Sequence, residues 1–162
     1  MLNEFYRSHA MHLLVNCERE PGSHRRFPRV GSFHYGNYGN EACMMVVVLE
    51  RRGYRREAQD CLDGWLRYQG TVELPGSFAS KHGVLYGSGG YAAGGYNQHH
   101  GWILWMLGEH FRYTQDEAWL RGAAPGMVSV ADWIIRGTAR TATRDELERG
   151  LLPAGSLEDM GD

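Results

Sequence analysis

Two stretches of this chain are apolar on every side. They are the runs ACMMVVVL at residues 42–49 and WILWML at residues 102–107. The first run would suit a buried strand on propensity alone. However, the polar residues 50–52 continue the pattern, and Gly53 is a typical helix stop. A helix that is apolar all round must be covered by neighbours, so we expect both runs to form inner helices.

Each of these runs is followed by the pattern of an amphipathic helix. After the first run, residues 54–69 carry one apolar face, made of Tyr54, Ala58, Cys61, Leu62, Trp65 and Leu66. The second run lies within a helical pattern at residues 98–113. Just after it, Thr114 and Glu117 have the spacing of a capping box. The helix that follows is expected to break at Pro125 and then to turn its apolar residues inward: Met127, Val128, Ala131, Ile134 and Ile135. The sequence therefore predicts two hairpins, each with an inner and an outer helix.

A further amphipathic helix is expected at residues 2–19, with Leu2, Phe5, Tyr6, His9, Leu13, Leu14 and Cys17 on its buried face. Long loops follow at 21–40 and 70–96. Three loop segments, at 27–33, 74–78 and 152–157, share a proline, a Gly-Ser pair and an apolar residue. Recurring helical hairpins belong to solenoids or closed toroids. We predict an all-α fold in which residues 1–162 form one helical-hairpin repeat unit, part of an (α/α) toroid, with its long loops on one rim.

Composition excludes several classes of function. The formal net charge is −2 and no apolar stretch approaches the roughly 20 residues that cross a bilayer, so neither nucleic acid nor membrane is an expected partner. The three cysteines are odd in number and include no Cys-x-x-Cys pair, which favours reduced thiols and a cytoplasmic location. No cofactor is expected.

The predicted rim gathers amides, hydroxyls and aromatic rings. One loop supplies Tyr35, Asn37, Tyr38 and Asn40; the next, after the glycine-rich stretch 87–95, supplies Tyr91, Tyr96, Asn97, Gln98, His99 and His100, with Trp102 just beyond. The N-termini of the inner helices would add unpaired amide donors at the same place. Directional hydrogen bonds beside flat aromatic faces suit a sugar, so we expect a carbohydrate ligand.

Four segments carry a resemblance to a known family. GNYGNEA at 36–42, the stretch 96–120, ADWI at 131–134 and GLLPAG at 150–155 are similar to parts of bacterial six-hairpin glycosidase-like proteins, which are (α/α) barrel glycoside hydrolases and their uncharacterised relatives. The resemblance covers most of the chain. It implies an inner ring of six helices, an active site at the rim of long loops, and hydrolysis by a pair of carboxylic acids.

Glu41 is the leading candidate for one of these acids because it begins an inner helix beside a loop of glycine and aromatic residues. A carboxylate in a first helical turn is also favourable without any catalytic role. Glu158 and Asp159, in the third loop, are candidates for the second carboxylate; a disordered chain end is the other interpretation. Glycosidase chemistry needs the two carboxyl groups about 5 to 9.5 Å apart.

The histidine and tryptophan residues have simpler interpretations. Adjacent His99 and His100 point in different directions on a helix and lack a partner at i+4, so no metal site is predicted. One of them is expected to contact ligand or transfer a proton and the other to pack against a neighbour. Of the five tryptophans, four are expected in the core, and Trp102 is the exception.

Two hairpins and a flanking helix amount to about two and a half of six hairpins. Either the chain is a fragment of a longer protein, or several copies associate and cover the exposed inner faces; we expect a homo-oligomer. Two functions of different class stay open. The full-length or oligomeric form is a glycoside hydrolase, or the chain is a non-catalytic helical-repeat module that binds sugar or only assembles.

Overall fold

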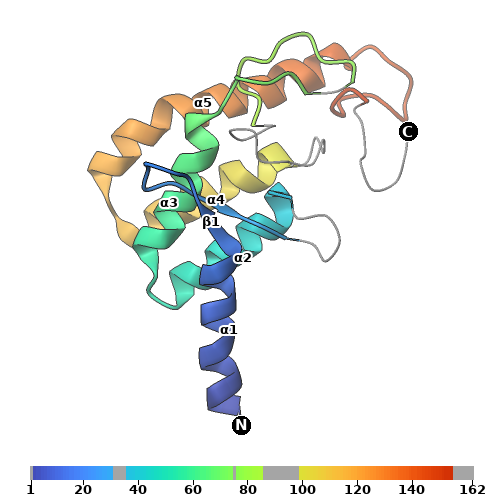
Figure 1. The fold of residues 1–162 in the computed structure, drawn as a ribbon. Helices are drawn as coiled ribbons and strands as arrows, with labels where there is room; N and C mark the ends of the chain where they lie inside the picture. The colour runs from blue at the N-terminus through green and yellow to red at the C-terminus, as the bar shows by residue number, and fades with distance from the viewer. Residues whose placement is uncertain (1, 31–35, 75, 86–98, 155–162) are drawn as a thin grey trace.

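The computed structural model describes residues 2–30, 36–74, 76–85 and 99–154. Most of these residues are helical (Figure 1). The helices are α1 (Leu2–Asn16), α2 (Gly39–Arg51), α3 (Arg55–Arg67), α4 (His99–Thr114) and α5 (Glu117–Arg140). Two short antiparallel strands, β1 (Cys17–Arg19) and β2 (Arg26–Pro28), pair with Cys17 opposite Pro28. A mostly helical chain was predicted, but this small sheet was not.

The two apolar runs are the centre of the core. Helices α2 and α4 lie side by side. Their buried apolar residues belong to one hydrophobic cluster, which includes Val46, Leu49, Ile103 and Leu107. Of the two interpretations that residues 42–49 allowed, helix is therefore correct. Gly53 follows α2 with φ +83, a conformation that glycine adopts without the cost paid by other residues, and it turns the chain into α3.

Helices α2 and α4 run parallel and in register. Near their N-termini the backbone N–H of Gly39 donates to Nδ1 of His99 at 3.4 Å. Near their C-termini the carboxylate of Glu50 contacts Nδ1 of His110, and both side chains are fully buried. A Cβ atom on Gly39 would lie 2.8 Å from the Cβ of His99, so only glycine allows this approach.

Helix α3 buries the face that was predicted for it. Ala58, Cys61, Leu62 and Trp65 are all buried. The β1–β2 hairpin packs closely on the same helix at Gly64. A Cβ atom there would lie 3.0 Å from the backbone oxygen of Arg26 and 3.1 Å from the ring of Phe27. Strand β1 thus occupies the end of the predicted helix 2–19, and β2 lies in the predicted loop 21–40.

Helix α5 differs from the prediction at its start, middle and buried face. Asp116, rather than Thr114, caps it by accepting a hydrogen bond from the Trp119 backbone N–H at 2.9 Å. The helix continues through Pro125 without a break. Its buried residues are Ala123, Val130, Trp133 and Gly137, whereas Val128 and Ile135, which were expected to face inward, are exposed. In one uninterrupted helix the buried residues form a single stripe along its length. A helix that restarted after Pro125 would have buried a different face.

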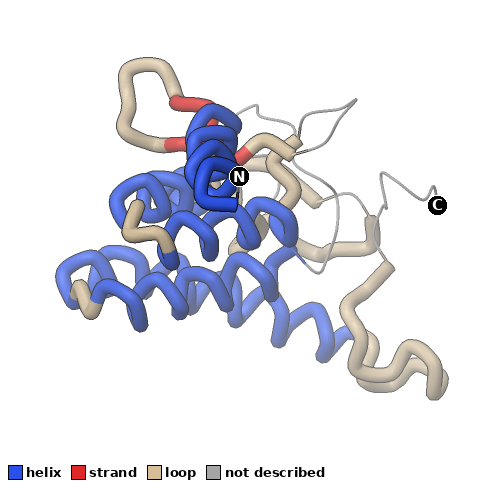
Figure 2. The backbone as a smooth tube through the Cα atoms, turned by 90° about the horizontal axis from the view of Figure 1, so that it is seen from below, coloured by secondary structure: helices blue, strands red, loops and turns tan. Residues whose placement is uncertain are grey.

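Helix α1 projects away from the other helices, with the N-terminus at its far end (Figure 1). Its predicted buried face is wrong: Leu2, Phe5 and Tyr6 are exposed, and the buried residues are Ala10 and Leu13. The helix ends at Asn16, and Cys17 begins β1 instead of extending the helix. Viewed nearly along α1, the two strands lie beside it (Figure 2).

None of the helices in the described ranges is long and apolar enough to cross a membrane. The grouping of α2 with α3 and of α4 with α5 follows the predicted order of inner and outer helices. That these pairs are units of a toroid stays a prediction.

The contact between Gly39 and His99 predicts a specific difference between two glycine substitutions. Gly39→Ala would place a methyl group against His99 and Ile103, 2.8 and 3.1 Å from their nearest atoms, and should lower the free energy of unfolding by about 1–3 kcal/mol. Gly101→Ala, in the first turn of α4, meets nothing within 4 Å and should be neutral or stabilise by up to about 1 kcal/mol. Urea unfolding of both variants measures this. Equal changes in the two would contradict the close packing of α2 on α4.

Candidate functional site

The N-termini of α2 and α4 bring together part of the predicted rim. Residues 37–41 lead into α2, and His99 begins α4 directly beside Gly39. Two backbone hydrogen bonds between Val30 and Gly36, at 2.9 and 3.1 Å, close the loop that precedes Asn37. Two segments that are 60 residues apart in the sequence therefore meet at one end of the inner helices.

Asn37 has an unusual environment at this place. Its side chain is 0% exposed, and neither its Nδ2 donor nor its Oδ1 acceptor has a hydrogen-bond partner among the residues that the structure describes. Leaving a buried polar group unpaired costs about 1–3 kcal/mol. An amide of this kind offers a donor and an acceptor to a ligand that has both, such as a sugar with neighbouring hydroxyl groups.

The other predicted residues of this first loop are partly accessible. Tyr38 precedes α2 and is half-buried, and its ring lies under Gly36, where a Cβ atom would come within 2.6 Å. Asn40 is half-buried, and its Oδ1 atom also has no partner in the described part of the chain. Glu41 is exposed in the first turn of α2, where the positive end of the helix dipole favours a carboxylate.

Both histidines at the start of α4 are packed. His99 is 3% exposed and contacts Gly39. His100 is 1% exposed; its Nε2 atom accepts a hydrogen bond from the Leu85 N–H at 3.0 Å, and its ring stacks on Trp133 at 3.8 Å. These contacts give both side chains a structural role, and contact between either one and a ligand stays a prediction.

Two tryptophans are exposed on α4. Trp102, the one tryptophan that was not expected in the core, is 38% exposed. Trp105 was expected in the core, and this prediction is wrong because its side chain is 46% exposed. Their rings meet edge to face, with centroids 5.7 Å apart. A run that is apolar in every position has no period from which the exposed face could be read, so the sequence held no signal for Trp105.

Several predicted site residues lie outside the described residues. They are Tyr35, Tyr91, Tyr96, Asn97, Gln98, Glu158 and Asp159. Both candidates for the second carboxylate are in this group, so their separation from Glu41 stays open. The described ranges hold no group of three or more His, Cys, Asp or Glu side chains that could bind a metal ion.

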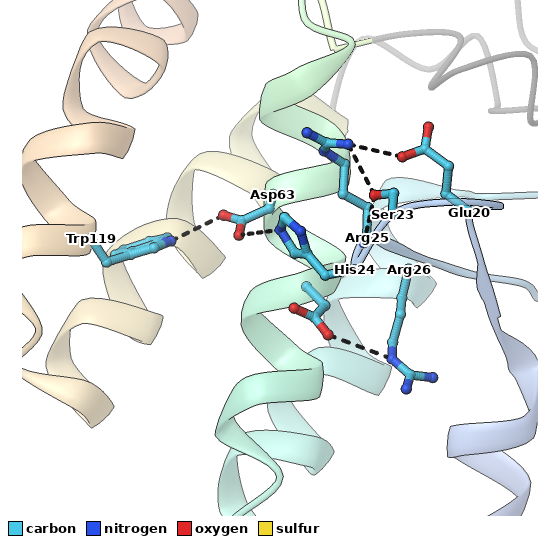
Figure 3. A network of polar contacts seen from close by, with 8 residues as sticks. Glu20, Ser23, His24, Arg25, Arg26, Asp63 and Trp119 are labelled. Atoms are coloured by element: carbon cyan, nitrogen blue, oxygen red, sulfur yellow. Dashed lines mark hydrogen bonds and ion pairs between the residues drawn. The ribbon is translucent and has the colours of Figure 1, made fainter.

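A groove lies between α3 and α5 and was not predicted. This α3–α5 groove has a volume of about 390 Å³, and His24, Arg25, Asp63, Arg67 and Trp119 supply its polar and aromatic lining. The indole N–H of Trp119 donates to Asp63 at 3.1 Å, and Nε2 of His24 lies 3.4 Å from the other oxygen of Asp63 (Figure 3). No local pattern points to this groove, because residues 20–25 belong to a segment that the sequence predicts only as a loop.

Polar side chains in and beside the α3–α5 groove pair with one another. Arg25 donates to Glu20 and to Ser23, each at 3.0 Å, and Nε of Arg26 lies 3.7 Å from the carboxylate of Asp60 (Figure 3). The contacts of Arg25 lie within the β1–β2 hairpin, whereas the Arg26–Asp60 and His24–Asp63 contacts join the hairpin to α3, and the Trp119–Asp63 bond joins α3 to α5. The network therefore explains the packing of three elements.

Glu20 is the most perturbed carboxyl of this network. A hydrogen bond from the Tyr68 hydroxyl, with smaller contributions from Ser23 and Arg25, lowers the pKa of Glu20 to about 2. Tyr68 is the residue that follows α3, so this bond ties the hairpin to the end of that helix.

Comparison with known proteins found no matching family model, no matching curated protein and no matching solved structure.

The lowered pKa of Glu20 predicts a pH dependence of stability. The folded-state pKa lies below the usual value of 4.5, so the stabilisation is present above about pH 4.5 and is lost as the pH falls toward 2. Tyr68→Phe removes the largest cause and should raise the pKa of Glu20 toward 4.5. Arg25→Gln, which removes a smaller cause, should raise it less. Carboxyl NMR titration of Glu20 in the three proteins tests this order. A reversed order would show that the charge of Arg25, not the Tyr68 hydroxyl, sets the pKa.

Proposed function

We propose that this chain is a carbohydrate-active protein similar to the (α/α) barrel glycoside hydrolases, with its sugar site at the rim where α2 and α4 begin. The observation that carries the proposal is the buried Asn37 amide, which has a donor and an acceptor without partners in the described ranges. A sugar presents hydroxyl groups that satisfy both.

Further features of the rim support the same ligand class. The backbone N–H of Gly39 donates to His99, but those of Asn40 and Glu41 lie in the first turn of α2, where the helix supplies no acceptor, and they add donors next to Asn37. The exposed indole of Trp102, in the first turn of α4, offers an apolar face for the C–H groups of a sugar ring. Glu41 stands exposed at the start of α2, in position to act as an acid or a base on a bound glycoside.

The parallel packing of α2 on α4, with α3 and α5 outside them, supports the proposal that these helices are neighbours in the inner ring of a toroid. Apolar side chains stay exposed on the inner helices at Met44, Trp102 and Trp105. Surfaces of this kind mark interfaces, so the proposal includes association of several copies through the inner faces.

The alternative is a module that binds sugar, or only assembles, without hydrolysing. It differs from the hydrolase in the role of one side chain. In the hydrolase Glu41 transfers a proton, and in the module it only stabilises the start of α2.

Two assays separate these possibilities. The first measures binding of a panel of mono- and disaccharides by calorimetry, and the second measures turnover of p-nitrophenyl glycosides of both anomers. Asn37→Ala should weaken binding by roughly tenfold or more, because one hydrogen-bonding group in a buried site contributes about 1.5 kcal/mol. Glu41→Gln should abolish turnover in the hydrolase and leave binding nearly unchanged.

Glu117→Gln is the matched control, since Glu117 is an exposed carboxylate in the first turn of α5. It should change neither assay. Saturable binding without turnover in the unmodified protein would support the module. Absence of both would overturn the proposed function, provided that circular dichroism shows the protein to be folded.

A further inference from the structure

Two of the three cysteines face each other across the contact between the hairpin and α3. Cys17 begins β1, directly after α1, and Cys61 lies in the middle of α3. Their Sγ atoms are 4.0 Å apart, and the two side chains are 3% and 1% exposed. Both thiols are free in the structure. A disulfide joins sulfurs about 2 Å apart, so side-chain rotation with a small shift of the hairpin closes the distance.

We infer that Cys17 and Cys61 form an intramolecular disulfide when the protein meets a hydroperoxide, and that this bond locks the β1–β2 hairpin onto α3. The sequence pattern predicted only reduced thiols, because residues 44 positions apart show no Cys-x-x-Cys spacing. The fold brings the two cysteines together although they are far apart in the sequence.

The two thiols differ in a way that assigns their roles. The hydrogen bond with Cys61 and the charge of Arg26 lower the pKa of Cys17, whereas the same contact and burial raise the pKa of Cys61. Thiolates attack peroxides and thiols do not. Cys17 is therefore the sulfur that meets the oxidant, and Cys61 is the sulfur that resolves the product.

The chemistry balances with hydrogen peroxide as the oxidant. The Cys17 thiolate attacks one peroxide oxygen, the O–O bond breaks, and Cys17 sulfenic acid and hydroxide form. The Cys61 sulfur then attacks the Cys17 sulfur, the S–O bond breaks, and the hydroxyl leaves as water with the Cys61 proton. Together the two thiols lose two electrons and two protons, and one hydrogen peroxide becomes two waters.

The bond would act on the α3–α5 groove, because the locked hairpin carries His24 and Arg25. It would also close a long loop of chain and so restrict the unfolded state. Oxidation is thus expected to raise stability and to slow amide exchange within residues 17–28. Since both sulfurs are buried, the peroxide reaches them when the hairpin opens, and the reaction should be slow compared with that of an exposed thiol.

Cys43 supplies the matched control. It is 2% exposed on α2, and burial raises its pKa to about 12. It shares the burial of the other two cysteines and lacks the thiolate character of Cys17, so it should stay reduced.

The test oxidises the reduced full chain with hydrogen peroxide, removes the excess with catalase, and blocks free thiols with N-ethylmaleimide in denaturant. Peptide mass spectrometry should find Cys17 linked to Cys61 with the loss of two hydrogens and Cys43 alkylated, in the same yield at low and high protein concentration. A linkage through Cys43, sulfinic acids at Cys17, or two fully alkylated thiols would overturn the inference.

Thermal unfolding provides a second readout. Oxidation should raise the melting temperature by roughly 5–15 °C, and dithiothreitol should reverse the change. Cys43→Ser should keep this shift, and Cys17→Ser and Cys61→Ala should each lose it. A shift that persists in either of these two variants would show that oxidation acts elsewhere, for example on methionine.

Discussion

The packing of α2 against α4 is the constraint on which the rest of the structure depends. Its two ends are held by different interactions, the close approach of Gly39 to His99 and the buried contact between Glu50 and His110. In both pairs the partners are 60 residues apart in the sequence. A slip by one residue along either helix would leave a buried carboxylate without its partner, which costs several kcal/mol. The pair therefore selects one register among many that apolar side chains alone would tolerate.

The outer layer follows from this register. The rings of Trp119 and His110 meet edge to face, with centroids 4.4 Å apart, and the same indole donates to Asp63 on α3. At the other end His100 stacks on Trp133 of α5. Helix α5 is thus positioned from both ends of α4. The Trp119 indole and the packing of Leu66 against Gly126 join α3 to α5. The rim at the start of α2 and α4 and the α3–α5 groove are two consequences of the same arrangement.

How far the sequence predicts this fold depends on the kind of signal. The two apolar runs identify the inner helices, the first also through its stop at Gly53. The periodic face of residues 54–69 identifies α3, because local pattern and burial agree there. The pattern fails for α1, whose apolar residues Leu2 and Phe5 are exposed. Periodicity shows which residues share a face but not whether any other element covers it. It also fails at Pro125, because the helix continues through that proline.

In the candidate site, too, some features follow from the sequence pattern and others depend on how distant segments pack. That residues 37–41 and His99 meet at one end follows from two parallel inner helices, and the sequence predicts it. The burial of Asn37, the exposure of Trp105 and the contact of Cys17 with Cys61 each depend on where distant segments pack, so no local pattern reports them. The β1–β2 hairpin, only three residues to a strand, is too short for alternation to be recognised.

The central proposal is a sugar site at the rim, rather than in the α3–α5 groove. Backbone amide chemical shifts recorded while a binding saccharide is titrated test it most directly. The account predicts that the largest shift changes fall at residues 37–41 and 99–102, with the amide group of Asn37 among them. Changes confined to residues 20–25, 63–67 and 118–123 would place the ligand in the α3–α5 groove and would contradict the claim.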